Sequence, residues 1–300
     1  MEILINDEPI DVTLESEKTV GEVLDGIDSW LAGSHMTVTA FALDSASMAA
    51  QRTPELTSQP IDSVNTLRVQ ARTQPEAQAN ALQTILEFVT TIRAALSEKR
   101  DELVRDLLSD WQHVAGSTAM AELFRADAQS LLDELGGVVD EAVRSDTTDS
   151  TPRREAITRL DQLATIISGR LHELAQPAQE EAATAGLLST LLPRVAEISV
   201  LLQSGKDREA MDLVVRFTEL TGKLLRLRSV RLAMGQDVTL PSSGATAEEF
   251  GAELNEMLGE LLTAFDSRDS VLIGDLLEYE IVPRIEQVVA ASSVEKRENE

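Results

Sequence analysis

Residues 207–220, DREAMDLVVRFTEL, carry a pattern that occurs again at 101–114 (DELVRDLLSDWQHV) and at 269–282 (DSVLIGDLLEYEIV). In each copy an Asp follows a short polar turn, and apolar residues lie near offsets of four, seven and thirteen, with an aromatic residue at ten. The Asp and aromatic pairs are Asp101 with Trp111, Asp207 with Phe217, and Asp269 with Tyr279. Such self-similarity marks tandem copies of one supersecondary unit. Because the turns are short, the unit that we predict is an antiparallel helical hairpin.

Each repeated residue type has an expected structural role. The Asp is suited to N-cap the second helix, since its carboxylate can accept from free backbone N–H groups. The offsets define one helical face, so the aromatic is expected to fill the core of the hairpin; the alternative is that it lines a groove for a partner helix. A weaker fourth copy is obtained if Arg153 replaces the Asp, with the downstream set Ile157, Leu160, Leu163 and Ile166.

The helical pattern extends over most of the chain after residue 80. We expect helices at about 78–97, 101–115, 118–144, 153–175, 184–203, 207–234, 246–265 and 270–291, with kinks or restarts at Pro193 and Pro283. The predicted organisation is a polar linker at 74–80, helical-hairpin repeats or a bundle at 81–292, and a charged disordered tail at 293–300. The pattern is compatible with either an extended solenoid or compact bundles.

Residues 1–73 have the alternation of strands instead. Ile3 and Ile5, then Ile10, Val12 and Leu14, alternate with polar residues on either side of an Asn6–Pro9 turn, which predicts a hairpin. Thr19 and Glu22 have capping-box spacing before a helix that Gly33 ends. Its expected apolar stripe is Val20, Val23, Leu24, Ile27, Trp30 and Leu31. Further strands are predicted at 36–43 and 66–71.

This order, from MEILIN through TVGEVLDGIDSWL to NTLRVQAR, resembles the ubiquitin-like β-grasp fold. The resemblance implies a small docking module that presents an open sheet face. Ubiquitin-type modifiers end in Gly-Gly, whereas this chain continues through Arg72-Thr73-Gln74-Pro75, so conjugation as a modifier is not expected. The predicted fold class is therefore α+β, a β-grasp domain followed by an all-α region.

Composition excludes several classes of protein. The net charge of −26 disfavours nucleic acid and anionic membranes as partners and is compatible with a basic protein partner. The absence of cysteine excludes disulfides, thiolate metal sites and a cysteine nucleophile. The N-terminus lacks the order of a signal peptide, and no apolar run reaches the roughly 18 residues of a membrane span. We expect a cytoplasmic protein.

No motif with catalytic chemistry is present. The three histidines, His35, His113 and His172, lack the spacing of a metal pair. The acidic turns 146–149 and 266–269 lack the Gly and Glu of a calcium loop, and Gly136-Gly137 has no preceding strand or phosphate-binding Lys. The glycine pair is expected to permit close helix packing. We predict no enzyme activity, no cofactor and no metal.

The segment DLLEYEIVP, 275–283, is the least interchangeable, because it holds the chain's only tyrosine between two acids and a proline. Its structural interpretation is a kinked final helix; its functional interpretation is a partner-binding surface formed by Asp275, Glu278, Tyr279, Glu280 and Pro283. The stretch GDLLEYEIVPRIE resembles uncharacterised bacterial helical proteins from motility gene neighbourhoods, which implies a flagellar or secretion-assembly role.

The function expected from these features is non-enzymatic protein binding, as a scaffold, adaptor or chaperone that is a monomer or small homo-oligomer. The partner would be basic or would offer an amphipathic helix. The alternative is a self-assembling structural or filament-associated component.

Overall fold

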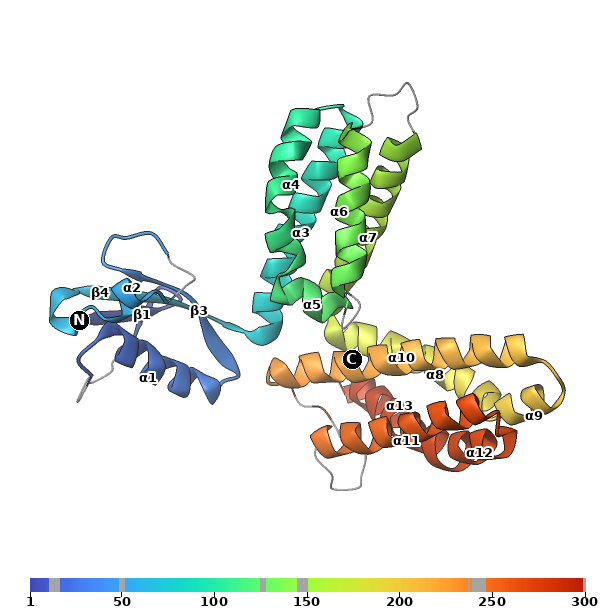
Figure 1. Cartoon of the computed structure of the whole chain (residues 1–300). Helices are drawn as coiled ribbons and strands as arrows, with labels where there is room; N and C mark the ends of the chain where they lie inside the picture. The colour runs from blue at the N-terminus through green and yellow to red at the C-terminus, as the bar shows by residue number, and fades with distance from the viewer. Residues whose placement is uncertain are drawn as a thin grey trace. The chain divides into compact units, whose positions relative to one another are not determined.

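The computed structural model describes the chain except residues 11–16, 49–51, 125–127, 145–150, 237, 239–246 and 299–300. It contains a four-stranded mixed sheet in the N-terminal region and helices after it (Figure 1). The predicted α+β class is confirmed. Contacts divide the chain into two units, unit 1 (Met1–Ala175) and unit 2 (Gln176–Glu300).

The sheet of unit 1 has the strand order β2-β1-β4-β3. Its strands are β1 (Glu2–Ile5), β2 (Glu8–Ile10), β3 (Met36–Leu43) and β4 (Thr66–Thr73). β1 pairs antiparallel with β2 and parallel with β4, and β4 pairs antiparallel with β3. Asn6 and Asp7 form the β1–β2 turn with φ of 52° and 66°, as a two-residue hairpin with right-handed twist requires. The predicted continuation at Val12 and Leu14 lies outside the described residues.

Helix α1 (Val20–Ala32) covers one face of this sheet. Thr19 and Glu22 form the predicted capping box at its start, and Gly33 is its C-cap. Five of the six residues in the predicted apolar stripe are buried, but Trp30 is 64% exposed. The assignment of Trp30 to the core was therefore wrong. Two short helices, α2 (Pro54–Thr57) and η1 (Ile61–Ser63), precede β4.

No linker separates β4 from the first long helix. Residues 74–80, predicted to be a polar linker, form the first turns of α3 (Gln74–Ser97). Thr73 accepts from the backbone N–H of Glu76, and the Glu76 carboxylate accepts from the N–H of Thr73. This second capping box, with Pro75 in the first turn, begins a helix at the residue where the strand ends.

Four helices of unit 1, α3, α4, α6 and α7, form a bundle in which α3 and α6 each contact α4 and α7, and the short helix α5 connects α4 to α6 (Figure 1). The bounds are α4 (Asp101–Ala115), α5 (Thr118–Phe124), α6 (Ala128–Arg144) and α7 (Thr151–Ala175). Trp111 lies in the bundle core, where its ring stacks on Phe88 and its Nε1 donates to the Leu132 carbonyl at 3.0 Å. A Cβ on Gly136 would lie 2.8 Å from the Trp111 Nε1, so the glycine does permit close packing.

Unit 2 is a second bundle, in which α8 contacts α10 and α13, α9 contacts α10 and α12, and α11 contacts α12 and η3. The bounds are α8 (Pro177–Val195), α9 (Ile198–Gln203), α10 (Asp207–Ala233), α11 (Ala247–Ser267), α12 (Ser270–Asp275), the π-helix η3 (Leu276–Ile281) and α13 (Val282–Glu298). The helix predicted at 184–203 is interrupted after Val195, two residues beyond Pro193, which itself lies inside α8. Residues 293–298 of the predicted disordered tail belong to α13.

A buried ionic network joins α8, α10 and α13. Glu181 is only 1% exposed, and its two carboxylate oxygens accept from Arg228 Nη1 and Arg231 Nη1, each at 2.7 Å. The hydroxyl of Ser292 donates to Glu181 Oε1 at 2.6 Å and accepts from Arg228 at 2.9 Å. A buried carboxylate is tolerated only with such partners, because an unpaired charge in the interior is costly.

The three hairpin turns share one backbone conformation. Lys99, Gly205 and Arg268 have φ of 57°, 73° and 56°, and each follows the last residues of a helix. In all three the N–H of the next residue bonds to a carbonyl five residues back, which is the Schellman helix end. The three sequence copies are therefore genuine structural repeats of a turn.

The role of the repeated Asp differs between copies. Only Asp269 is an N-cap, accepting from the N–H groups of Val271 and Leu272. Asp101 and Asp207 are first helical residues, and the preceding N-cap residues make no side-chain cap bond. Asp101 instead accepts from Arg153 at 2.8 Å. The N-cap prediction is wrong for these two, because each lies two residues after its left-handed residue, whereas Asp269 comes directly after Arg268.

The turn before the weaker fourth copy, residues 145–150, lies outside the described residues, so only its helix can be compared with the other copies. Arg153 lies at the start of α7 and donates to the Leu96 carbonyl at 2.9 Å, so it caps the C-terminal end of α3. Of the four predicted core residues, Leu160 and Leu163 are buried, whereas Ile166 is exposed and Ile167 takes its place.

Candidate interaction surfaces

The three repeated aromatic residues have different environments. Trp111 and Phe217 are buried, with 3% and 1% exposure, as the core interpretation predicted. Tyr279 is 68% exposed, so the core role predicted for it is wrong. A large aromatic side chain exposed to solvent is available for contact with a partner.

The turn conformation explains why Tyr279 lies outside the core. Trp111 and Phe217 each come twelve residues after the left-handed residue of their turn, but in the third copy that position is Glu280. A regular α-helix would therefore bury Glu280. The π-helix η3 contains one additional residue per turn, which leaves Glu280 exposed and brings Ile281, fully buried, into the core position.

Pro283 is the second residue of α13, two positions after the end of this π-helix, and is half-buried. It has no N–H to continue the helical ladder, and the predicted interruption at this proline takes the form of η3. Arg284 Nη1 donates to the Glu280 carbonyl at 3.1 Å. On the other side of η3, α12 packs closely on α9, since a Cβ on Gly274 would lie 2.8 Å from Ser199 Cβ. π-helical turns occur frequently at functional sites.

Acidic and apolar side chains surround Tyr279. We define the η3 surface as six exposed residues of α12 and η3: Val271, Leu272, Asp275, Glu278, Tyr279 and Glu280. Residues 271, 275 and 279 are four apart and so lie along one side of the helix. The charge of Glu278, its hydrogen bond with the phenol, and the charge of Asp275 raise the pKa of Tyr279 above its ordinary value. The structure therefore brings together the predicted binding residues Asp275, Glu278, Tyr279 and Glu280, with Pro283 at the end.

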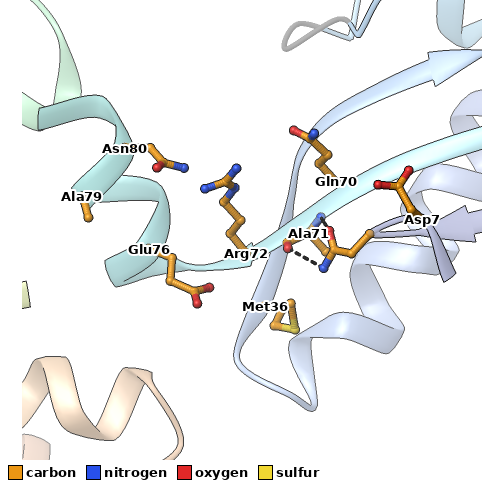
Figure 2. A pocket seen from close by; sticks show the side chains of 9 residues that line it. Asp7, Met36, Gln70, Ala71, Arg72, Glu76, Ala79 and Asn80 are labelled. Atoms are coloured by element: carbon orange, nitrogen blue, oxygen red, sulfur yellow. Dashed lines mark hydrogen bonds between the residues drawn. The ribbon is translucent and has the colours of Figure 1, made fainter. Parts of the chain in front are cut away.

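A cavity of about 480 Å³ lies in unit 1 where β4 continues into α3 (Figure 2). The Arg72 side chain extends beside Asn80, and Glu76 points away from both. The side chain of Asn6 exchanges two hydrogen bonds with the backbone of Ala71, of 2.9 and 3.0 Å, and so extends the pairing of β1 with β4. Asp7, Arg72 and Glu76 give the lining of this cavity charges of both signs.

Within the described ranges, no group of three or more His, Asp or Glu side chains could hold a metal ion. His35 lies in the turn after α1, His113 on α4 and His172 on α7. No helix in the described part of the chain has the length and apolar character to cross a membrane.

Two features were not recognised in the sequence. The buried Glu181 network had a signal, because Arg228 and Arg231 interrupt the apolar face that Leu224 and Leu227 continue on α10. Charges on a core-facing stripe indicate a buried partner. The exposure of Trp30 had no comparable signal, since its spacing matches the buried stripe.

The fold and these surfaces define an α+β protein with a small sheet domain and paired helical hairpins. Comparison with known proteins gives two partial family matches: residues 1–73 match the model described as the TP0873 N-terminal domain, and residues 182–290 match a domain of unknown function, DUF8042. An uncharacterized protein of Treponema pallidum (strain Nichols) is 33% identical over 98 residues. The match covers 32% of this chain and about half, 49%, of that relative. No solved structure matches.

Proposed function

We propose that this chain is a non-enzymatic protein-binding protein, a scaffold, adaptor or chaperone, that holds its partner on the η3 surface. The observation that carries the proposal is the exposure of Tyr279 on a π-helix whose core position is filled by Ile281. Tyrosine is among the residues that contribute most to binding at protein interfaces. Exposed Val271 and Leu272 extend the apolar area along the same helix.

The charges of the η3 surface favour a particular class of partner. Asp275, Glu278 and Glu280 are exposed around the tyrosine, and the whole chain has a net charge of −26. Acidic groups around an apolar centre steer and orient a partner with complementary basic groups. A helix with apolar residues on one face and Lys or Arg beside them meets both requirements.

The proposed setting is bacterial flagellar or secretion assembly in the cytoplasm, on the resemblance of GDLLEYEIVPRIE to helical proteins from motility gene neighbourhoods. The N-terminal sheet, with parallel β1 and β4 and one crossing helix, supports the β-grasp resemblance and a docking role for this domain. Self-association into a structural component is the competing function, and concentration-dependent sedimentation distinguishes it.

The test is affinity purification of the tagged full-length protein from its host, with Tyr279→Ser and Val215→Ser compared in parallel. Val215 is a matched control, because it is an exposed aliphatic residue on α10 outside the η3 surface. We expect one abundant protein to co-purify and its recovery to fall at least about tenfold for Tyr279→Ser alone. Equal recovery with both variants, assembly that grows with concentration, or turnover of a metabolite would contradict the proposal.

A further inference from the structure

A second surface lies on the N-terminal domain, separate from the η3 surface. A cavity of about 220 Å³ opens between helix α1 and the β1–β2 hairpin. Its lining is apolar except for Glu17 and consists otherwise of Ile3, Ile10, Val23, Gly26, Ile27 and Trp30. We name this cavity the α1 hollow. Ile3, Val23 and Ile27 are core residues, so the hollow opens directly onto the hydrophobic core of the domain.

The α1 hollow lies at the edge of the sheet. Among the described residues, β2 (Glu8–Ile10) is the edge strand next to β1. Gly26 adds to the space, because it has no side chain and a Cβ there would meet no atom within 4 Å. Glycine within a helix is destabilising by roughly 0.5–1 kcal/mol relative to Ala. Packing within the described chain does not require glycine here, whereas an inserted side chain from outside would.

The surroundings restrict what could fill the α1 hollow. Residues 17–33 include four acids and one base, and Arg52 pairs with two of these acids, Asp25 and Asp28, so the α1 region retains an excess of two negative charges. Pro9 lies in the centre of β2 and lacks an N–H, which disfavours addition of a partner strand at that edge. An occupant therefore has to enter through its side chains. Trp30 lies at the edge of the hollow and is 64% exposed. Its ring offers the large apolar contact area that tryptophan provides at the centre of many protein interfaces.

We propose that the α1 hollow binds a basic amphipathic helix of a partner protein, which inserts a large aliphatic side chain over Gly26 and against Trp30. This site is on the helix side of the domain, not on the open sheet face that the β-grasp resemblance implied. It is independent of the proposed function of the η3 surface. A chain with both surfaces would hold two helical segments at once and act as an adaptor.

The test uses the full-length protein and a synthetic helical peptide of leucine and lysine, with the leucines along one face. Trp30 emission should move to shorter wavelength as the peptide covers the ring, while Trp111, buried in the bundle, serves as an unchanged background. A second peptide with serine at every leucine position keeps the charge and should leave the emission unchanged. Binding at the η3 surface would not move this signal.

Variants of α1 locate the binding site. Gly26→Leu fills the hollow and should raise the dissociation constant of the peptide at least about tenfold, because the new side chain excludes the apolar side chain that the peptide inserts. Ala32→Leu adds the same side chain at an exposed position outside the hollow and should change binding by less than about twofold. A peptide with a photoreactive leucine should cross-link to α1 in the unmodified protein, which gives a result independent of how the variants fold.

Several results would overturn the proposal. These are an unchanged Trp30 emission with the leucine peptide, an equal shift with the serine peptide, equal binding by Gly26→Leu and Ala32→Leu, or cross-links elsewhere. An emission shift that develops without peptide as protein concentration rises would assign the hollow to a second copy of the chain instead.

Discussion

Replacing Glu181 with alanine should lower the free energy of unfolding of unit 2 by about 3–5 kcal/mol. The carboxylate is 1% exposed and accepts hydrogen bonds from Arg228, Arg231 and Ser292 at 2.6–2.7 Å. Its removal leaves two buried guanidinium groups without this partner, and the loss of a partner is the costly way to disrupt a buried ion pair. For a unit of about 125 residues, this corresponds to a decrease in melting temperature of roughly 11–19 °C.

The distribution of aromatic residues allows each unit to be followed separately. Both tryptophans, Trp30 and Trp111, lie in unit 1, so tryptophan fluorescence reports on that unit, whereas far-ultraviolet circular dichroism reports on both. Guanidinium titration of Glu181→Ala should displace the part of the dichroism transition that belongs to unit 2. The fluorescence transition should be unchanged.

The neighbouring Glu180 provides a matched control. It pairs with Lys223 at 2.6 Å at a partly exposed position, so Glu180→Ala should cost about 1 kcal/mol or less. A triple variant with Leu at 181, Met at 228 and Leu at 231 should recover most of the loss, because apolar residues can replace a buried ionic network. If Glu181→Ala costs no more than Glu180→Ala, the assignment of the network as a buried stabilising element is refuted.

Two further predictions concern the last hairpin. Tyr279 is the chain's only tyrosine, so its ultraviolet titration is a single curve; its midpoint should lie above about 10 and fall toward that value in Glu278→Gln. Because the folded-state pKa is raised, the associated stability is present below the unfolded-state pKa and is lost as pH rises through the folded-state pKa. Gly274→Ala should destabilise unit 2 by about 1–3 kcal/mol, because its Cβ would lie 2.8 Å from Ser199 Cβ, and Ser199→Gly should restore the stability. Gly259→Ala, where a Cβ meets nothing within 4 Å, should instead be neutral or stabilising in the same thermal melts.

Much of the architecture could be predicted because it depends on local signals. The capping box at Thr19 and Glu22 defines the start of α1, and the alternation in β1, β3 and β4 defines the sheet. Short turns predicted antiparallel hairpins, and within each unit the hairpins pack into a bundle. The prediction of a linker at 74–80 was wrong because it relied on the polar composition of these residues and did not consider the capping box that begins at Thr73.

The candidate site could be predicted only in part. Residues at the η3 surface were identified from the composition of DLLEYEIVP, but their exposure depends on the π-helix, which hydrophobic spacing does not encode. The same spacing predicted a core position for Tyr279, as it did for Trp111 and Phe217. The backbone determines where the left-handed residue of each turn lies. It also determines whether the following helix contains a π-helical turn with one extra residue. The α1 hollow likewise depends on how α1 packs against the β1–β2 hairpin.

The π-helix also affects how this hairpin can change in evolution. At the aromatic position of the other two hairpins, a substitution alters a buried side chain and therefore packing. In the third hairpin, Ile281 fills the core position, while Tyr279 and its acidic neighbours are exposed to solvent. The buried residue and the exposed aromatic residue are therefore at different positions. Substitutions at residues 278–280 therefore leave the core packing unchanged, whereas equivalent substitutions at Trp111 or Phe217 would destabilise the fold and be removed by selection for stability.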